Sequence, residues 1–286
     1  MSKIIACIDG STYADSICRL SAWAAKQTGM RVCLLHIAAP HTEMKAKVDL
    51  SGSIGLGAKS SLLKELTKID EEHGKLEQHK GVEILERAKK VLAENGIEQP
   101  EILHRRGSLV ETIAEIGDQA ELIVVGKGGE QDNAKAGYVG AHLDRLAHAT
   151  HKSLLIATKE TREVKRFLIA YDGSPSSNKA IEYVSSQLLF EDLECHILCV
   201  TEKTPGAERS LAYAENKIKE SGIQVIAHLH HEEAVAVAVT DYIKEHDIDL
   251  LSMGAYGHSK MHSLFFGSTT KELIQTSQVP ILLFRG

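Results

Sequence analysis

The sequence lacks the features that would place the chain in a membrane or on nucleic acid. No apolar run approaches the roughly 18 residues that a membrane span needs, and no long basic run offsets the net charge of −6. The first residues, MSKIIACIDGS, become polar too soon for a secretory signal peptide. We therefore expect a cytoplasmic protein with no membrane span and no nucleic-acid partner.

Cysteine is scarce, and its placement excludes a disulfide framework. The five cysteines form no CxxC pair, their number is odd, and Cys7 and Cys33 lie inside apolar runs. This pattern is typical of buried free thiols in a reducing compartment. The sequence HLHHEE at 228–233 offers imidazoles and carboxylates, but alternation along a strand leaves two histidines on one face without a clear third ligand. We expect no metal site.

Two stretches of the chain repeat each other. Asp9-Gly10-Ser11 and Asp172-Gly173-Ser174 each end an apolar run, 163 residues apart, and each leads into a helical pattern and a second apolar run. The later parts also match, since in both an apolar run is followed by a glycine loop, a helix and another apolar run. We therefore predict a duplicated domain, with copies at 1–158 and 163–286.

Each copy predicts alternating strands and helices that end in a fifth strand. In the second copy the expected strands are about 166–171, 194–200, 223–229, 249–253 and 280–284. Short apolar runs that alternate with helical patterns are typical of a parallel sheet covered on both faces. The first copy carries an insert at about 40–80, and we expect its stretch LSGSIGLGAKSS to be mobile because it is rich in glycine and serine.

The stretch GAYGHSKMHSLFFGSTT, residues 254–270, follows the fourth strand of the second copy. Ligands of open parallel sheets bind beyond the carboxyl ends of the strands, near the point where strand order reverses. Glycines there would let a phosphate approach bare amides, and Gly267-Ser268-Thr269 would open a helix whose N-terminus favours an anion. The alternative is that these residues only make turns and cap the helix. Asp172 has the same two interpretations, a nucleoside contact or an Asp-Gly turn.

Recognised catalytic motifs are missing. The chain has no GxxxxGK[ST] loop, no dinucleotide GxGxxG and no GxSxG nucleophile elbow. Phosphoryl transfer needs a positioned nucleophile and charge stabilisation, and near residues 254–270 we find Lys260 as a cation and no obvious base. We therefore assign no catalytic residue and favour a binding module over an enzyme.

The spacing Gly-x2-Gly-x9-Gly-[Ser/Thr], after a strand in an α/β unit whose first loop carries an aspartate, resembles that of the universal stress proteins. The resemblance covers nearly the whole chain, and its motif is intact in the second copy. It implies two tandem Rossmann-like α/β domains, each a five-stranded parallel sheet with helices on both faces, packed as a pseudo-two-fold pair. It also implies a stress-response protein that binds ATP or a related adenine nucleotide, alone or with Mg²⁺. The residues that it assigns to the nucleotide are Ala170, Asp172, Val200, Gly254, Gly257, Gly267, Ser268 and Thr269.

The first copy departs from this motif. Gly126 and Gly129 keep the first spacing, but Gly140 comes only after ten further residues and no hydroxyl follows it. The loop before Gly140 carries acidic side chains, which would oppose a polyphosphate. Asp9 and Ile37 keep the positions of the aspartate and of the adenine edge. We expect this site to be empty, weak or altered in ligand.

Both copies end in an apolar strand, SLLIA at 153–157 and PILLF at 280–284. Exposed edges of this kind pair with another strand, and in the resembled family they pair across a two-fold axis. The duplication would let one chain form that pair internally, and further dimerisation and an unidentified protein partner stay open. Two alternatives to a nucleotide-binding regulatory module remain. One is a slow ATPase or ATP-dependent enzyme, and the other is a nucleotide-independent scaffold or small-molecule binder.

Overall fold

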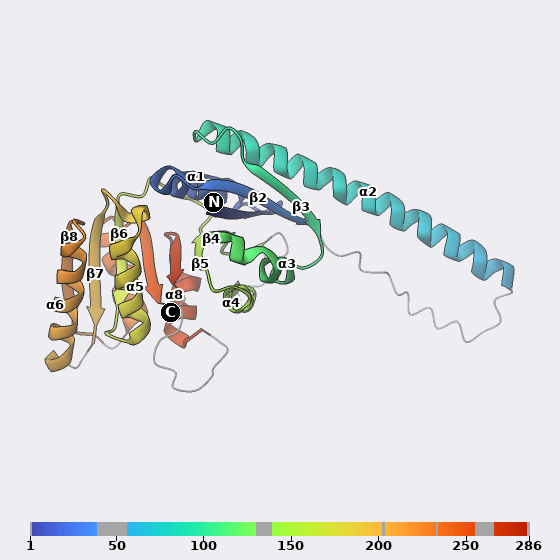
Figure 1. The fold of residues 1–286 in the computed structure, drawn as a ribbon. Helices are drawn as coiled ribbons and strands as arrows, with labels where there is room; N and C mark the ends of the chain where they lie inside the picture. The colour runs from blue at the N-terminus through green and yellow to red at the C-terminus, as the bar shows by residue number, and fades with distance from the viewer. Residues whose placement is uncertain are drawn as a thin grey trace.

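The computed structural model describes residues 2–38, 56–129, 139–201, 204–232, 234–254 and 266–284. These residues build a single ten-stranded sheet with helices packed against both of its faces (Figure 1). The elements of the first half are β1 (Lys3–Ile8), α1 (Ala14–Thr28), β2 (Arg31–Ala38), α2 (Leu56–Glu94), β3 (Glu101–Arg106), α3 (Leu109–Ile116), β4 (Ala120–Gly126), α4 (Val139–Ala149) and β5 (Ser153–Ala157).

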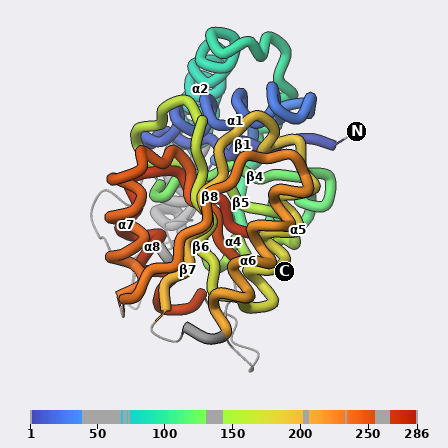
Figure 2. The backbone as a smooth tube through the Cα atoms, turned by 90° about the vertical axis from the view of Figure 1, so that its left-hand side faces the viewer, coloured from blue at the N-terminus to red at the C-terminus, as the bar shows by residue number. Residues whose placement is uncertain are grey.

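The second half repeats this order. Its elements are β6 (Arg166–Tyr171), α5 (Pro175–Ser186), β7 (Glu194–Val200), α6 (Thr204–Glu220), β8 (Val225–His230), α7 (Val235–Glu245), β9 (Leu250–Gly254), α8 (Ser268–Thr276) and β10 (Ile281–Phe284). Figure 2 shows α7 and α8 on one side of the strands of this half, and α5 and α6 on the other. The five strands expected from the sequence are all present here, with ends that agree to within about two residues.

Local chemistry explains several of these bounds. Helix α1 ends at Gly29, which takes the left-handed conformation with φ of 69° and donates its N–H to the carbonyl of Ala25. Glycine adopts this conformation without steric penalty, so it is a common helix terminator. Helix α5 begins after Ser174, whose hydroxyl accepts from the N–H of Ser177 at 3.2 Å, and Pro175 occupies its first position.

The strand order is β3-β2-β1-β4-β5-β10-β9-β6-β7-β8. Neighbours within each half run parallel, and only the central pair is antiparallel, with Leu155 of β5 opposite Leu282 of β10. Each half therefore contributes five parallel strands, and the internal pairing of the two closing strands is confirmed. Because β5 and β10 are buried along their whole length, the junction removes both apolar edges from water.

Two layers of buried apolar side chains hold the helices on the sheet. Helices α1, α2, α5 and α6 contribute to one layer, and helices α3, α4, α7 and α8 contribute to the other. Both layers run through the junction, since Leu155 and Leu282 belong to the first and Leu154 and Leu283 to the second. The two halves thus share their core. Burial of each such leucine contributes roughly 1.5–3 kcal/mol.

The sequence predicts an insert at about 40–80 with a mobile glycine- and serine-rich stretch, and part of this insert is instead helical. Residues 56–80 belong to α2, which is 39 residues long and spans about 58 Å. Figure 1 shows this helix projecting beyond the sheet. Among the side chains of this helix that the structure describes, Leu85, Ala88 and Leu92 in its last part pack into the core. The glycine- and serine-rich stretch therefore continues into helix from Leu56, while the part of the insert before Leu56 lies outside the described residues.

The thiols behave as the sequence predicted. All five cysteines are free and buried. Burial raises the pKa of Cys18 to about 12 and that of Cys33 to about 11, which keeps both thiols protonated near neutral pH. Among the described residues, no helix is both long enough and apolar enough to cross a bilayer.

Candidate functional site

Most of the described second-half residues that the sequence assigns to the nucleotide lie at the carboxyl ends of three neighbouring strands. Strands β9, β6 and β7 are neighbours and run parallel, so their carboxyl ends meet. Strand order reverses between β6 and β9, and this is where open α/β sheets bind ligands. Ala170, near the end of β6, lies between Met253 of β9 and Leu198 of β7 in the sheet register.

Asp172 follows β6 directly and is exposed. Its Oδ1 accepts from the N–H of Ser174 at 2.9 Å, and the intervening Gly173 has φ of 73°. This is an Asx turn, in which the side chain organises its own backbone. The turn fixes the carboxylate at the carboxyl end of β6. Asp172 can therefore organise the turn through Oδ1 and also contact a ligand.

Gly254, the last residue of β9, lies against the first turn of α5. A Cβ at this position would come within 3.1 Å of the carbonyl carbon, the carbonyl oxygen and the Cβ of Ser176. Glycine therefore allows β9 to approach α5 closely without displacing Ser176. This contact joins the start of the glycine loop to the Asp172 turn. Gly257 lies outside the described residues.

Gly267 precedes helix α8 and differs from the residues that precede two other helices. Ser108 and Ser174 cap α3 and α5 with their side chains, whereas no side chain caps α8 at Gly267, as is also the case before α1 and α7. Gly267 has φ of −59°, and a Cβ there would meet nothing within 4 Å among the described residues. Gly267, Ser268 and Thr269 are all exposed. The first amides of α8, with the positive end of the helix dipole, suit an anion.

Val200 ends β7 and is half-buried at the same edge. The residue after it, Thr201, donates its N–H to the carbonyl of His230 at 3.0 Å, which continues the pairing with β8. The structure thus brings the ends of β6, β7 and β9 together, and it adds the N-terminus of α8 as the element that follows β9 in the chain.

The first half builds a similar edge with different side chains. Asp9 makes the equivalent turn, accepting from the N–H of Ser11 at 3.0 Å. Gly126 again ends the fourth strand, but a Cβ there would come within 2.8 Å of the carbonyl oxygen of Gly128 and 2.9 Å of Tyr13 Cβ. Tyr13 stands at the repeat position of Ser176. The first half therefore has an aromatic side chain at the position where the second half has a serine hydroxyl.

The remaining first-half candidates lie on or beside three different elements. Gly129 follows β4 by three residues, and Gly140 is the second residue of α4 rather than its N-cap. Ile37 lies in β2 opposite Arg105 of β3. Gly140 therefore does not occupy the position that Gly267 has before α8.

Two side chains that the sequence analysis did not single out connect this half to α8. Lys127, next to Gly126, and Asp144 of α4 both bond to the backbone that flanks α8. In the sequence, Lys127 could have been noticed as a lysine inside a glycine loop. Its partner Gln275 is 148 positions away in the chain, so no local pattern reveals the contact between them.

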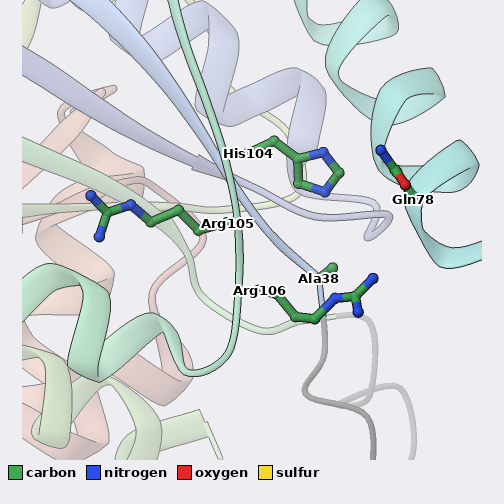
Figure 3. A pocket seen from close by; sticks show the side chains of 5 residues that line it. All are labelled: Ala38, Gln78, His104, Arg105 and Arg106. Atoms are coloured by element: carbon green, nitrogen blue, oxygen red, sulfur yellow. The ribbon is translucent and has the colours of Figure 1, made fainter. Parts of the chain in front are cut away.

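A cavity of about 240 Å³ lies at the ends of β2 and β3 in the first half, lined by Ala38, Gln78, His104, Arg105 and Arg106 (Figure 3). Arg105 points to the other side of β3, where its Nη1 donates to Glu115 Oε2 at 2.7 Å. Burial, followed by the neighbouring His36 and Arg106, lowers the pKa of His104. In the sheet, β1 separates this cavity from the glycine loop after β4.

The histidine-rich strand β8 forms no metal centre with the described residues, in which no group of three or more potential ligands converges. His230 instead contacts the carboxylate of Glu232 at 3.1 Å.

The comparisons with known proteins agree with this architecture. A universal stress protein of Synechocystis sp. is 33% identical over 295 residues, and the alignment covers 100% of both chains. The solved structure of a universal stress protein from Archaeoglobus fulgidus has a TM-score of 0.67 at 19% identity, over 99% of this chain and 96% of its own. A functionally unknown protein from Pseudomonas aeruginosa PAO1 has a TM-score of 0.59 at 14% identity, over 100% and 92%.

The two structural likenesses show the fold. The sequence of the chain matches the universal stress protein family over residues 1–158 and again over 163–285. With this match in both halves and a full-length relative at 33% identity, the chain belongs to the universal stress protein family.

Proposed function

We propose that the second half binds ATP or a related adenine nucleotide, alone or with Mg²⁺. In this proposal the phosphates lie at the N-terminus of α8, and the nucleoside lies where the carboxyl ends of β6, β7 and β9 meet. The protein would then be a cytosolic stress-response module whose protein partner responds to nucleotide occupancy. The family membership supports the stress-response role.

The observation that carries the proposal is the uncapped N-terminus of α8. The described structure gives no steric reason for glycine at 267, because its φ is ordinary and a Cβ there would meet no neighbour. A phosphate that approaches the backbone supplies such a reason, since a side chain would stand in its place. The exposed hydroxyls of Ser268 and Thr269 add hydrogen-bond donors beside the free amides.

The nucleoside end has the matching chemistry. The exposed carboxylate of Asp172 accepts hydrogen bonds, which suits ribose hydroxyls, and its turn holds it at the edge. Val200 and Ala170 are half-buried apolar residues at the same edge, where an adenine ring would be partly removed from water. Gly254, which has no side chain, lies close to Ser176 at the same end of the strands.

The test is to denature the purified full chain and to quantify the released nucleotide by chromatography and mass spectrometry. We expect about one adenine nucleotide per chain, because the glycine motif is intact in the second copy and altered in the first. Added ATP should also raise the melting temperature, since a ligand that binds only the folded state stabilises it. A ratio near two would show that the first half binds as well.

Gly267→Asp is the decisive variant. Aspartate is a favoured N-cap residue, so the fold should hold, while its carboxylate would repel the phosphates and fill their place. We expect nucleotide affinity to fall at least about tenfold. The matched control is Gly140→Asp in the first turn of α4, which should leave the nucleotide of the second half in place. If the wild type releases none and ATP does not shift the melting temperature, the nucleotide-independent scaffold replaces this proposal.

A further inference from the structure

Helix α8 packs beside α7 of its own half and also beside α4 of the first half. It is nine residues long and buries only Leu273 and Ile274 among its own residues. So short a helix has little stability of its own. Its position therefore depends on what holds its two ends.

The C-terminal end of α8 is held by Lys127 of the first half. Lys127 Nζ donates to the carbonyl oxygen of Gln275 at 2.5 Å and to that of Ser277 at 3.0 Å. The last turn of α8 has no basic residue of its own, so Lys127 supplies the cation that the negative end of the helix dipole favours. Burial lowers the pKa of the Lys127 ammonium, and its two carbonyl partners offset this loss of hydration.

The backbone of Lys127 is fixed as well. Its N–H donates to the carbonyl of Ala157, at the end of β5, at 2.8 Å. The lysine thus projects from a point that is tied to the central part of the sheet. Its side chain is the link between the glycine loop of one half and the last helix of the other.

The N-terminal end of α8 is held by Asp144 of α4. Asp144 is 3% exposed, and its Oδ1 accepts from the N–H of Phe266 at 2.9 Å. Phe266 is itself buried and directly precedes Gly267. His148 Nε2 lies 3.9 Å from the same carboxylate oxygen, one turn further along α4. A buried carboxylate that accepts from a backbone amide fixes that amide firmly.

We propose that Lys127 and Asp144 are positioning residues through which the first half sets the nucleotide affinity of the second. This inference rests on the function proposed above, and it adds how the duplication regulates that site. The phosphates would contact the first amides of α8, and preorganised amides bind more tightly than amides that must first be ordered. The coupling is reciprocal, so a nucleotide at α8 also tightens the contacts that Lys127 and Asp144 make.

The test compares Lys127→Met with Lys152→Met in the full chain. Methionine keeps most of the length of lysine and removes its charge. Lys152 is a matched control, because it is also a partly exposed lysine of the first half. Its Nζ lies 4.0 Å from Glu121 Oε2, a carboxylate of the same half. Hydrogen exchange of α8 without ligand is the first readout, and the affinity for ATP by calorimetry is the second.

In Lys127→Met we expect the amides at the end of α8, such as the Ser277 N–H bonded to Leu273, to exchange about tenfold faster. Exchange in α7 should not change. ATP should bind about fivefold to tenfold more weakly, while Lys152→Met should match the wild type in both measurements. A second pair gives an independent arm. Asp144→Ala should speed exchange at Phe266, and Asp144→Asn, which keeps an acceptor oxygen, should restore slow exchange.

Each outcome decides a separate point. Unchanged exchange of α8 in Lys127→Met and Asp144→Ala would overturn the positioning role, whether or not nucleotide binds. Faster exchange with unchanged ATP affinity would overturn the coupling. If the wild type binds no ATP, the proposed function fails and the coupling fails with it, while hydrogen exchange still decides whether the first half positions α8.

Discussion

The two halves share one backbone plan and differ in the side chains at their ligand edge. Asp9 and Asp172 make the same turn with nearly the same hydrogen bond, of 3.0 Å and 2.9 Å. Both fourth strands end in a glycine that lies against the first loop, yet Gly126 meets Tyr13 and Gly254 meets Ser176. The turn and the close strand approach are thus kept where the fold needs them, while the neighbouring side chains have diverged.

The loops after the fourth strands also differ between the two halves. In the second half β9 leads to α8, whose N-terminus has no side-chain cap. In the first half the residue after Gly126 is Lys127, which reaches across to the carbonyls at the far end of α8. If the second half binds the nucleotide as proposed, one copy of the duplicated domain keeps the ligand site while the other supports it.

The largest effect should come from the junction that both halves share. Leu282 and Leu155 face each other across β10 and β5, and both are 0% exposed. Leu282→Ala removes buried apolar surface and leaves a cavity, so we expect the free energy of unfolding to fall by about 2–5 kcal/mol. Urea denaturation followed by circular dichroism measures this loss.

The matched control for the junction is Leu188→Ala. Leu188 lies on the second half but is 58% exposed, so its truncation should change stability by no more than about 0.5 kcal/mol. Because both core layers cross the junction, Leu282→Ala should weaken both halves in one transition. Two separate transitions, with the first half unaffected, would show that the halves do not depend on each other.

A smaller effect should distinguish the glycines. Gly126→Ala would place a Cβ 2.8 Å from a backbone oxygen, and we expect a loss of about 1–3 kcal/mol. Gly254→Ala should cost less, because its nearest approach to Ser176 is 3.1 Å. Gly267→Ala should change stability by no more than about 0.5 kcal/mol, since its Cβ would meet none of the described residues within 4 Å. Equal losses at all three sites would contradict this ranking, which chemical denaturation of the apo protein measures.

Much of the fold could be predicted because the same order of apolar runs and helical patterns occurs in both copies, and each run lies within a short stretch of the chain. The apolar runs at 166–171 and 194–200 coincide with β6 and β7 at both ends. The pairing of β5 with β10 also followed, from the apolar strand that ends each copy and from the strand pairing that the family resemblance implies. The residues that meet at the ligand edge could be predicted from strand order alone, whereas their role with a nucleotide stays a proposal.

Other features depend on contacts that no local pattern carries. Helix α2 begins at Leu56, inside a stretch whose glycines and serines argue against helix. Lys127 and Asp144 bond to a backbone carbonyl and a backbone N–H of the other half, and every residue type except proline carries both groups, so the residue types do not reveal these contacts. A comparison of the copies was the available clue, because the second copy has Ala255 where the first has Lys127.

The smallest effect concerns a backbone conformation that both halves keep with different residues. Gly29, after α1, has φ of 69°, and Asp192, at the repeat position before β7, has φ of 61°. The left-handed conformation is strained for a residue with a Cβ, although aspartate tolerates it better than most. Asp192 is exposed, so replacing it loses little else.

We therefore expect Asp192→Gly to raise the free energy of unfolding by about 0.5–1 kcal/mol, with an unchanged denaturant slope. Asp118→Gly is the control, because Asp118 is also exposed but is not among the residues with positive φ, and there glycine should lower stability by a similar amount. If both substitutions destabilise equally, Asp192 gains from its side chain what it loses in strain. The second half would then hold this turn by its carboxylate, whereas the first half holds the same turn by glycine.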